Sequence, residues 1–401
     1  MHPFDLSDDH PFGPHHLPYG AVSEPGGRPR LAVRLGEHAL DLSGVAAGTP
    51  WEQAVGEPTL NALLELGPSA WGGLRAHLQE LLRDPARRGE VEPHLRPLDG
   101  LTEHLPVDVK DYVDFYASEQ HATNVGSIFR PDGDPLTPNW KHLPIGYHGR
   151  SSTVVVSGTP VTRPTGQRKA PQDSAPTFGP STKLDIEAEL AFVVGGGTPV
   201  GSRVGVDEAA GHLFGVALFN DWSARDIQAW EYVPLGPFLG KSFASSMAAW
   251  VTPMEALRAA RVPLPEQDPV PMDYLRGQGD SLFGLDLTME VRLRDTVVAR
   301  PPYATMYWSP TQMLAHLTVN GAALTSGDLF ASGTTSGAGA GELGSLLELT
   351  WNGSRPLRLD DGRSRTFLED GDTVTITATA PGPGGSVIGL AEVSGTITPA
   401  G

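Results

Sequence analysis

Glycine and proline interrupt this sequence along its whole length. The chain has 48 glycines and 37 prolines among its 401 residues, about a fifth of the total, and they are not gathered in one low-complexity tract. Such frequent turn residues favour many short strands joined by tight turns. No fixed-period repeat is present to suggest a solenoid or a propeller. The sequence therefore predicts a fold rich in β-strands.

Apolar and polar side chains alternate in several segments that we expect to be strands. Residues 285–293 carry an apolar side chain at every second position, which predicts one half-buried strand, and residues 31–42 alternate in a similar way. A short β-branched run at 153–156 predicts another strand. Few helices are expected between them, one capped by Ser223 and one starting after Ser309. We expect a mainly β (α+β) fold, closed or sandwiched.

The first hundred residues look like a separate small unit. After the early strands, Thr59 and Ser69 are each placed to cap a helix with an apolar face. The stretch from Arg83 to Gly100 is charged, contains proline and shows little apolar periodicity, so we expect a linker there. The predicted domains are residues 1–105 and 106–401.

Composition excludes several classes of protein. The 29 Lys and Arg residues against 47 Asp and Glu give a net charge of −18, which argues against a nucleic-acid partner. The absence of cysteine excludes a thiolate nucleophile, cysteine-bound zinc and iron–sulfur clusters, and it fits a reducing compartment. The first residues do not resemble a signal peptide, and no run approaches the roughly 18 apolar residues of a membrane helix. We expect a soluble, cytoplasmic protein without a membrane partner.

Two glutamates stand out in the apolar segment 184–194. The apolar side chains at 186, 190, 192 and 194 predict a strand, and its period of two places Glu187 and Glu189 side by side on one face. Like charges this close repel each other unless a cation neutralises them, and a hard divalent cation prefers such oxygen ligands. The alternative is an ordinary solvated strand face.

A third acid follows the next apolar run. Residues 214–219 predict a buried strand that ends at Asp221, just before the helix expected after Ser223. Arg225 and Gln228 are three residues apart and share a face of that helix, where they could stabilise a developing oxyanion. The alternative is that Arg225 only pairs with Asp221 or Asp226.

The segment 111–124 contains many reactive groups and few apolar ones. His121 is its best candidate for a general base, because an imidazole titrates near neutral pH, at about 6.5. The alternative is a structural histidine. The glycines at 236 and 240 are too close together for a phosphate-binding loop, and no G-x-S-x-G motif is present to indicate a serine hydrolase.

Several longer strings resemble the fumarylacetoacetate hydrolase family. They lie at 114–126, 139–150, 220–242, 326–329, 331–334 and 344–349. The resemblance runs from about residue 106 to the last residue and is strongest between 111 and 245. The first hundred residues match more weakly, in the manner of the family's small N-terminal SH3-like barrel domain. The rest would form the family's large mixed β-sandwich roll, the catalytic domain.

The resemblance implies a metal-dependent homodimer that hydrolyses a carbon–carbon bond. Its substrate would be 4-fumarylacetoacetate, a small diketo acid, and its products fumarate and acetoacetate, in the last step of tyrosine and phenylalanine catabolism. Matching the motifs residue by residue implies Ca²⁺ ligands at Asp114, Glu187, Glu189 and Asp221. A Mg²⁺ position would involve Asp221, Lys241 and Ser245, where the family usually carries threonine in place of Ser245.

The same matching implies the roles of the remaining site residues. His121 would be the general base, oriented by Glu348. The oxyanion-stabilising positions fall on Arg225, Gln228 and Lys241. The substrate-contacting positions fall on Tyr116, Arg130, Tyr147, Gln228, Tyr232 and Thr334. Leu347, Leu349 and Trp351 alternate with Glu348, so we expect Glu348 on the polar face of a strand.

Two alternative functions remain from the sequence. Another superfamily member, such as an acylpyruvate hydrolase or an oxaloacetate-type decarboxylase, would keep the metal carboxylates and change the substrate pocket. A non-catalytic calcium-binding β-domain would also need the carboxylates, but it would give no role to His121, Glu348 or the pair formed by Arg225 and Gln228.

Overall fold

A thirteen-stranded sheet joins the first hundred residues to the rest of the chain. The structure, a computed structural model, describes residue 4, residues 6–7 and residues 10–401. The main path of the sheet is β4-β3-β2-β1-β17-β14-β13-β22-β6-β7, while β5 pairs with β1, β16 with β14, and β8 with β16. Its strands are β1 (Tyr19–Ser23), β2 (Arg30–Leu35), β3 (His38–Asp41), β4 (Leu95–Pro97), β5 (Thr102–His104), β6 (Tyr112–Phe115), β7 (Gly146–His148), β8 (Val154–Val156), β13 (Ala188–Val194), β14 (Leu213–Asp221), β16 (Ser245–Met247), β17 (Trp250–Pro253) and β22 (Leu329–Ala331).

A second sheet of five strands packs against the first. Its order is β21-β20-β25-β26-β9, with β9 (Val161–Thr162), β20 (Thr288–Leu293), β21 (Thr296–Ala299), β25 (Thr373–Pro381) and β26 (Val387–Thr398). The long strand β26 contacts β14, β16 and β17 of the first sheet. Short two-stranded ribbons complete the β structure: β10 (Thr165–Arg168) with β11 (Thr177–Pro180), β12 (Leu184–Asp185) with β15 (Ser223–Ala224), β18 (Arg261–Val262) with β19 (Gly284–Leu285), and β23 (Leu357–Arg358) with β24 (Ser364–Arg365).

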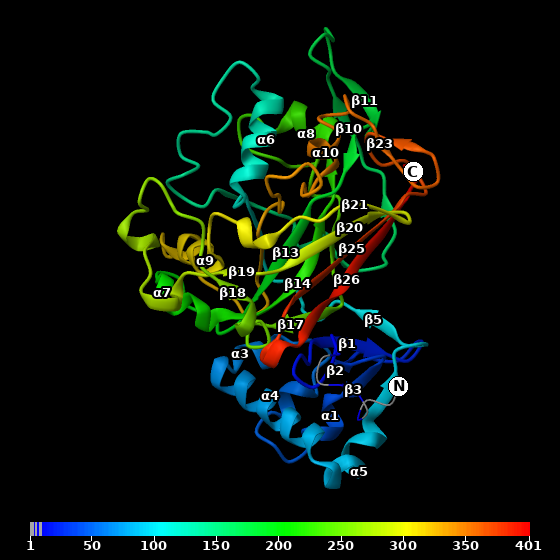
Figure 1. Ribbon diagram of the computed structural model, residues 1–401, viewed down its shortest axis with the longest axis vertical. Coiled ribbons are helices and arrows are strands. Elements are labelled where there is room, and N and C mark those ends of the chain that lie inside the picture. The colour runs from blue at the N-terminus through cyan, green and yellow to red at the C-terminus, as the bar shows by residue number, and fades with distance from the viewer. Residues whose placement is uncertain (1–3, 5, 8–9) are drawn as a thin grey trace.

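The helices lie mainly at the two ends of this β structure. They are α1 (Leu42–Val45), α2 (Glu52–Val55), α3 (Asn61–Glu65), α4 (Pro68–Arg83), α5 (Arg88–Val91), α6 (Glu119–Phe129), α7 (Val206–Ala209), α8 (Arg225–Glu231), α9 (Pro310–Thr318) and α10 (Leu346–Leu349). Helices α1, α3, α4 and α5 surround the blue N-terminal strands, whereas α6, α8 and α10 gather at the opposite end of the molecule (Figure 1). None of the helices in the described part of the chain is long and apolar enough to cross a membrane.

The central strands β13 and β14 are buried on both faces. Every residue of both strands is buried, and β14 contacts β25 and β26 of the second sheet. Neighbouring rings extend this core, as where Phe192 stacks on Phe330 with centroids 5.0 Å apart. The acidic side chains on these strands are therefore held away from water on a rigid base. The mainly β (α+β) class predicted from the sequence is confirmed.

The linker expected at 83–100 is wrong. Helix α5 occupies part of this stretch, and β4 pairs antiparallel with β3, so the segment belongs to the N-terminal sheet. Strand β1 pairs with β17 through Tyr19 and Val251, and the sheet runs on without interruption into the larger part. The pairings among the described residues give no closed barrel at this end. Because β4 is only three residues long, its periodicity was too short to reveal a strand.

Helix starts differ by one or two residues from the expected caps. Helix α4 begins at Pro68 with Gly67 as its N-cap, and α8 begins at Arg225 with Ala224 as its N-cap, so Ser69 and Ser223 do not cap them. The prediction at Ser309 is confirmed, since its side chain and Gln312 form a capping box. The strand expected over 285–293 is divided into β19 and β20, although its alternating burial is as predicted.

Candidate active site

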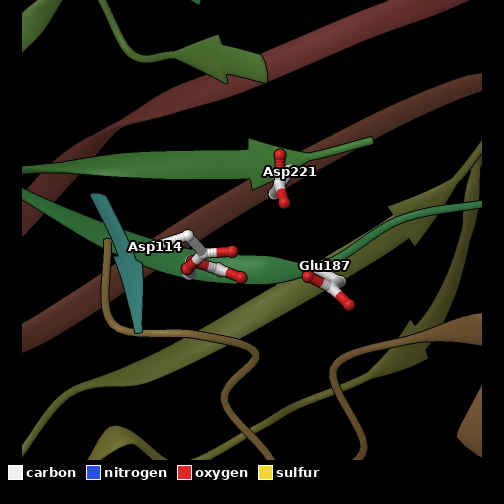
Figure 2. A group of neighbouring side chains, drawn as sticks. Asp114, Glu187 and Asp221 are labelled. Atoms are coloured by element: carbon white, nitrogen blue, oxygen red, sulfur yellow. The ribbon is translucent and has the colours of Figure 1, made fainter. Parts of the chain in front are cut away.

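Four acidic side chains from separate segments meet at one end of the central strands. Asp114 lies in β6, Glu189 in β13 and Asp221 at the last residue of β14, while Glu187 directly precedes β13. Figure 2 shows Asp114, Glu187 and Asp221 converging from these segments. One carboxylate oxygen from each of the four residues lies within 4.8 Å of the others, and all four residues are buried. The alternative of a solvated strand face is therefore wrong.

Two buried cations neutralise part of this cluster. Lys241 Nζ donates to Asp221 Oδ2 at 2.8 Å and also to Glu187, and Arg225 Nη1 lies 2.8 Å from Glu187 Oε1. Burial opposes ionisation of Glu187, but Lys241 and Arg225 outweigh it and lower the pKa of that carboxyl. Burial opposes the charge of Lys241 as well, but the attraction of Asp221 and Glu187 outweighs burial and raises the pKa of Lys241. Ser245 Oγ donates to Asp221 Oδ1 at 2.8 Å, so the hydroxyl at this position also contacts the cluster.

The other two carboxyls, those of Asp114 and Glu189, form no salt bridge with any residue that the structure describes. Burial and the charge of Asp221 raise the pKa of Asp114 well above its usual range, and burial and Asp114 do the same for Glu189. Tyr147 donates to Asp114 Oδ2 at 2.8 Å, and the Gly333 amide donates to Glu189 Oε2 at 3.1 Å. Asp114 Oδ1 and Glu189 Oε1 are buried and accept no hydrogen bond from the described residues. These two orphaned oxygens fit a hard cation, because such an ion would supply the missing partner.

A histidine and a glutamate form a buried pair beside the cluster. His121 Nδ1 lies 2.7 Å from Glu348 Oε2, and His121 Nε2 lies 4.0 Å from Glu187 Oε1. The Ser118 side chain caps α6 by accepting from the His121 amide, which places the imidazole in the first turn. Asn124 Nδ2 donates to Glu348 Oε1 at 2.9 Å. Burial opposes ionisation of Glu348, but His121 and the hydrogen bonds outweigh it and lower the pKa of Glu348.

Glu348 reaches this position from a helix. The strand expected around it is wrong, since Leu346–Leu349 forms the single turn α10 with Ser345 as N-cap. Ser345 Oγ accepts from the Glu348 amide and donates to Glu348 Oε2 at 2.8 Å, and Ser336 Oγ donates to the same oxygen at 3.0 Å. The pairing with His121 expected from the family resemblance is nevertheless present in the geometry.

Arg225 pairs with Asp185 and Glu187, not with Asp221 or Asp226 as in the alternative interpretation. Its Nε donates to Asp185 Oδ2 at 2.8 Å. Nη1 donates to Gln228 Oε1 at 3.2 Å, as their shared helix face predicted. Nη2 is buried and has no hydrogen-bond partner among the described residues. The guanidinium therefore keeps a free donor.

A cavity of about 370 Å³ connects these groups to solvent. Asp114, Glu187, His121, Arg225 and Lys241 line it. Glu189 and Glu348 contact residues of its wall, Gly333 and His121, whereas Asp221 and Ser245 line an adjoining cavity together with Lys241. The residues expected to contact substrate all line this cavity: Tyr116, Arg130, Tyr147, Gln228, Tyr232 and Thr334. Arg130 and Tyr232 are exposed, whereas Thr334 is buried and its hydroxyl has no partner among the described residues. The structure thus brings every predicted site residue to this cavity or beside it.

Asp185 and Asn124 were not singled out from the sequence. Asp185 shares the period of two with Glu187 and Glu189, so the alternation contained a signal for it. Asn124 follows His121 by three residues, the spacing of neighbours on one helix face. Both contacts depend on partners far away in the sequence, Leu346 for Asp185 and Glu348 for Asn124, which the local pattern could not reveal.

Comparison with known proteins gives one consistent result over nearly the whole chain. The model described as "Fumarylacetoacetate (FAA) hydrolase C-terminal" matches residues 110–397, and "Fumarylacetoacetase N-terminal" matches residues 15–106. Fumarylacetoacetase of Homo sapiens is 44% identical over 98% of this chain and 98% of its own length. Fumarylacetoacetase of Arabidopsis thaliana is 42% identical, covering 98% of this chain and 97% of its own.

Solved structures show the same fold at low identity. A fumarylacetoacetate hydrolase from Exiguobacterium antarcticum covers 96% of this chain and 99% of its own, with a TM-score of 0.57 and 16% identity. A maleylpyruvate hydrolase from Sphingobium sp. SYK-6 covers 96% of this chain and 100% of its own, with a TM-score of 0.53 and 15% identity. At these identities the likeness concerns the fold alone.

Proposed function

This chain belongs to the fumarylacetoacetase family, and we propose that it hydrolyses 4-fumarylacetoacetate to fumarate and acetoacetate in tyrosine and phenylalanine catabolism. The observation that carries the proposal is the arrangement around the cavity. His121, which pairs with Glu348, lines the same cavity as Asp114 and Glu187 of the carboxylate cluster and the buried cations Arg225 and Lys241. A binding module would have no use for a proton acceptor beside a free guanidinium donor, so the site favours an enzyme.

Asp114, Glu187, Glu189 and Asp221 would hold a divalent cation, for which we propose Ca²⁺. When bound, this ion would polarise the oxygens of the diketone and stabilise the negative charge that develops on the leaving group. A Mg²⁺ position would involve Asp221, Lys241 and Ser245. Because an ammonium group has no lone pair, Lys241 would take part there through its backbone carbonyl.

His121 would accept a proton from water through Nε2, while Glu348 holds Nδ1 and stabilises the imidazolium that forms. The hydroxyl then adds to the carbonyl carbon next to the fumaryl double bond. The carbon–carbon bond breaks toward the acetoacetate half, whose carbon finally takes a proton. The free Nη2 of Arg225, Lys241 and Gln228 lie where they can stabilise the charge on the attacked oxygen.

The remaining side chains of the cavity fit a small diketo acid with two carboxylates. Arg130 stands exposed on the wall and offers a cation to one carboxylate, and the buried Thr334 hydroxyl offers an unused hydrogen bond. Tyr116 and Tyr147 provide hydroxyl groups within the same wall, and the exposed Tyr232 also lines the cavity. We therefore propose these residues as substrate contacts.

Finer features of the chain are part of this proposal. We propose an SH3-like N-terminal domain over residues 1–105, a β-sandwich roll over 106–401, a homodimer and a cytoplasmic location. The two family matches, which meet between residues 106 and 110, support the boundary. The homodimer rests on the family resemblance, and a solution mass near 42.5 kDa instead of about twice that value would contradict it.

The direct experiment is an assay of the purified protein on fumarylacetoacetate. We expect loss of the diketone absorbance with release of fumarate and acetoacetate in equal amounts. A parallel assay with an acylpyruvate tests the nearest alternative, and a higher rate on that compound would replace the proposed substrate. No loss of absorbance with either compound in the presence of Ca²⁺ and Mg²⁺ would contradict an enzymatic role.

A further inference from the structure

Asp185 is a fully buried carboxylate that binds two parts of the active site at once. It lies in β12, and its side chain has no exposed surface. Its Oδ1 accepts from the amides of Ile186 and Leu346, each at 2.7 Å. Its Oδ2 accepts from the Leu347 amide at 3.0 Å and from Arg225 Nε at 2.8 Å. Both oxygens are therefore fully used by donors from three separate segments.

One side of this arrangement fixes the helix that carries Glu348. The amides of Leu346 and Leu347 are the first two of α10, and helix-initial amides have no partner within the helix. Asp185 accepts both of them from 161 and 162 residues away, while the N-cap Ser345 accepts the third amide, that of Glu348. The position of a one-turn helix depends on such contacts, because a helix this short has only a few backbone hydrogen bonds of its own.

The other side fixes Arg225. Because Nε is bound to Asp185 and Nη1 to Glu187 and Gln228, the planar guanidinium has one orientation, and Nη2 remains without a hydrogen-bond partner in the described part of the chain. Arg225 forms salt bridges with Glu187 and Asp185. Glu187 belongs to the carboxylate cluster, whereas Asp185 does not.

We propose that Asp185 is a positioning residue that fixes Arg225 relative to the His121–Glu348 pair. As a result, Arg225 Nη2 and His121 can both act on the same substrate carbonyl group. This inference rests on the proposed hydrolase function. Preorganised groups accelerate a reaction only if they are held in place before charge develops. A single carboxylate that contacts both Arg225 and the first amides of the helix carrying Glu348 couples their positions without lining the substrate cavity.

The test compares Asp185→Asn with Asp372→Asn. An amide puts an NH₂ group where one carboxylate oxygen was, so two of the four donors to Asp185 lose their acceptor in either orientation. Asp372 is a matched control, because it is equally buried and accepts from Arg365 Nε at 2.8 Å and from the Glu369 amide at 2.9 Å. Neither Asp372 nor those partners line the cavity.

We expect Asp185→Asn to lower kcat by about 100-fold with KM changed less than about threefold, the pattern for a lost interaction that acts in the transition state. Asp372→Asn should keep wild-type kinetics at a temperature where circular dichroism shows both variants folded. Combining Asp185→Asn with Arg225→Gln should be little worse than Arg225→Gln alone. Equal kcat in the two Asn variants, or fully multiplicative losses in the double variant, would overturn the inference.

A second variant covers the case in which Asp185→Asn does not fold. Asp185→Glu keeps the charge but displaces the carboxylate oxygens by one methylene group, so kcat should also fall in this variant. Wild-type kcat in folded Asp185→Glu would overturn the positioning role. Inactivity of the wild-type protein on fumarylacetoacetate would instead contradict the proposed function, so the two failures are distinguishable.

Discussion

Glu189 Oε1 and Asp114 Oδ1 are the buried carboxylate oxygens of the site that no described group satisfies. An unsatisfied buried acceptor ordinarily costs stability, so a residue that keeps one must gain from another interaction. Here the four oxygens within 4.8 Å account for that gain if a cation binds among them. The two unsatisfied oxygens therefore predict that activity depends on a bound metal ion.

Glu189→Gln should weaken Ca²⁺ binding by about tenfold or more, because it removes one of four charges around the ion. The fold should remain, since the amide oxygen can still accept from the Gly333 amide. Calorimetric titration of the metal-stripped protein with Ca²⁺ measures the affinity, and the exposed Glu266→Gln serves as control. Chelation should abolish wild-type activity and added Ca²⁺ or Mg²⁺ should restore it. Full activity of the metal-stripped enzyme would refute the metal role.

The His121–Glu348 pair gives a second prediction at this scale. Positioned general-base catalysis contributes roughly 10²–10⁴ in rate, so His121→Ala should lower kcat by at least about 100-fold with little change in KM. Glu348→Gln should cost less, because the amide still holds the ring without stabilising its charge. The double variant should be little worse than His121→Ala alone. Independent, multiplicative losses would show that Glu348 acts elsewhere.

At the scale of elements, α6 connects the proton acceptor to the wall of the cavity. Its first turn carries His121, and five residues further along Gly126 packs on the loop that contains Pro135. A Cβ at Gly126 would stand 1.8 Å from the Pro135 carbonyl oxygen, so the close packing requires glycine. Arg130 Nη2 donates to the same carbonyl at 2.5 Å. The helix therefore sets the position of the loop.

Gly126→Ala should force this loop away from the helix and destabilise the protein by about 1–3 kcal/mol, the usual cost of overpacking. KM should rise as well, because Arg130 and Pro135 line the cavity. Thermal unfolding and steady-state kinetics measure the two effects. Gly133→Ala in the same loop is the control, since its Cβ would have no neighbour closer than 4.0 Å. Similar behaviour of the two variants would contradict the role of the contact.

Apolar–polar periodicity in the sequence predicts helices and strands correctly where the periodic segment is long. The alternation at 285–293 predicts the correct buried face, and the residues that the family motifs identify lie at the cavity or beside it, although many other lining residues were not predicted. Glu348 was placed on a strand because four residues cannot distinguish a period of two from one of 3.6. The role of Asp185 could not be predicted from the sequence because its partners are remote along the chain. Strand β4 could not be predicted because three residues are too few to show a period of two.

At the scale of the molecule, the N-terminal segment is fastened to the larger part through buried polar contacts. His16 has no exposed surface, and its ring lies 2.8 Å from the Pro11 carbonyl oxygen and 2.9 Å from Thr252 Oγ1 of β17. Arg75 of α4 donates to the His16 carbonyl at 2.6 Å. The ring is thus enclosed where the two parts of the chain meet.

This enclosure predicts a loss of stability in mild acid. Burial lowers the pKa of His16 from 6.5 to about 3. As the pH falls, His16 is therefore protonated near pH 6.5 in the unfolded chain but only near pH 3 in the folded chain. The contribution of His16 is complete above pH 6.5 and falls by about 1.4 kcal/mol for each pH unit below it. Urea unfolding at pH 7 and pH 5 measures the difference. The difference in the free energy of unfolding between pH 7 and pH 5 should be smaller in His16→Gln than in the wild type, and it should stay the same in the exposed control His142→Gln. An unchanged difference in His16→Gln would contradict the assignment of this pH dependence to His16.

The pairing of β1 with β17 also determines what happens if the first hundred residues are cut away. Gly20 lies against the Trp250 ring so closely that a Cβ would stand 2.5 Å from it, and Trp250 Nε1 donates to Glu103 at 2.5 Å. Without this cover, β17 would present bare amides, bare carbonyls and a large aromatic ring to solvent at a sheet edge. Such an edge recruits strands from other molecules, so the truncated enzyme would aggregate instead of remaining a smaller active protein.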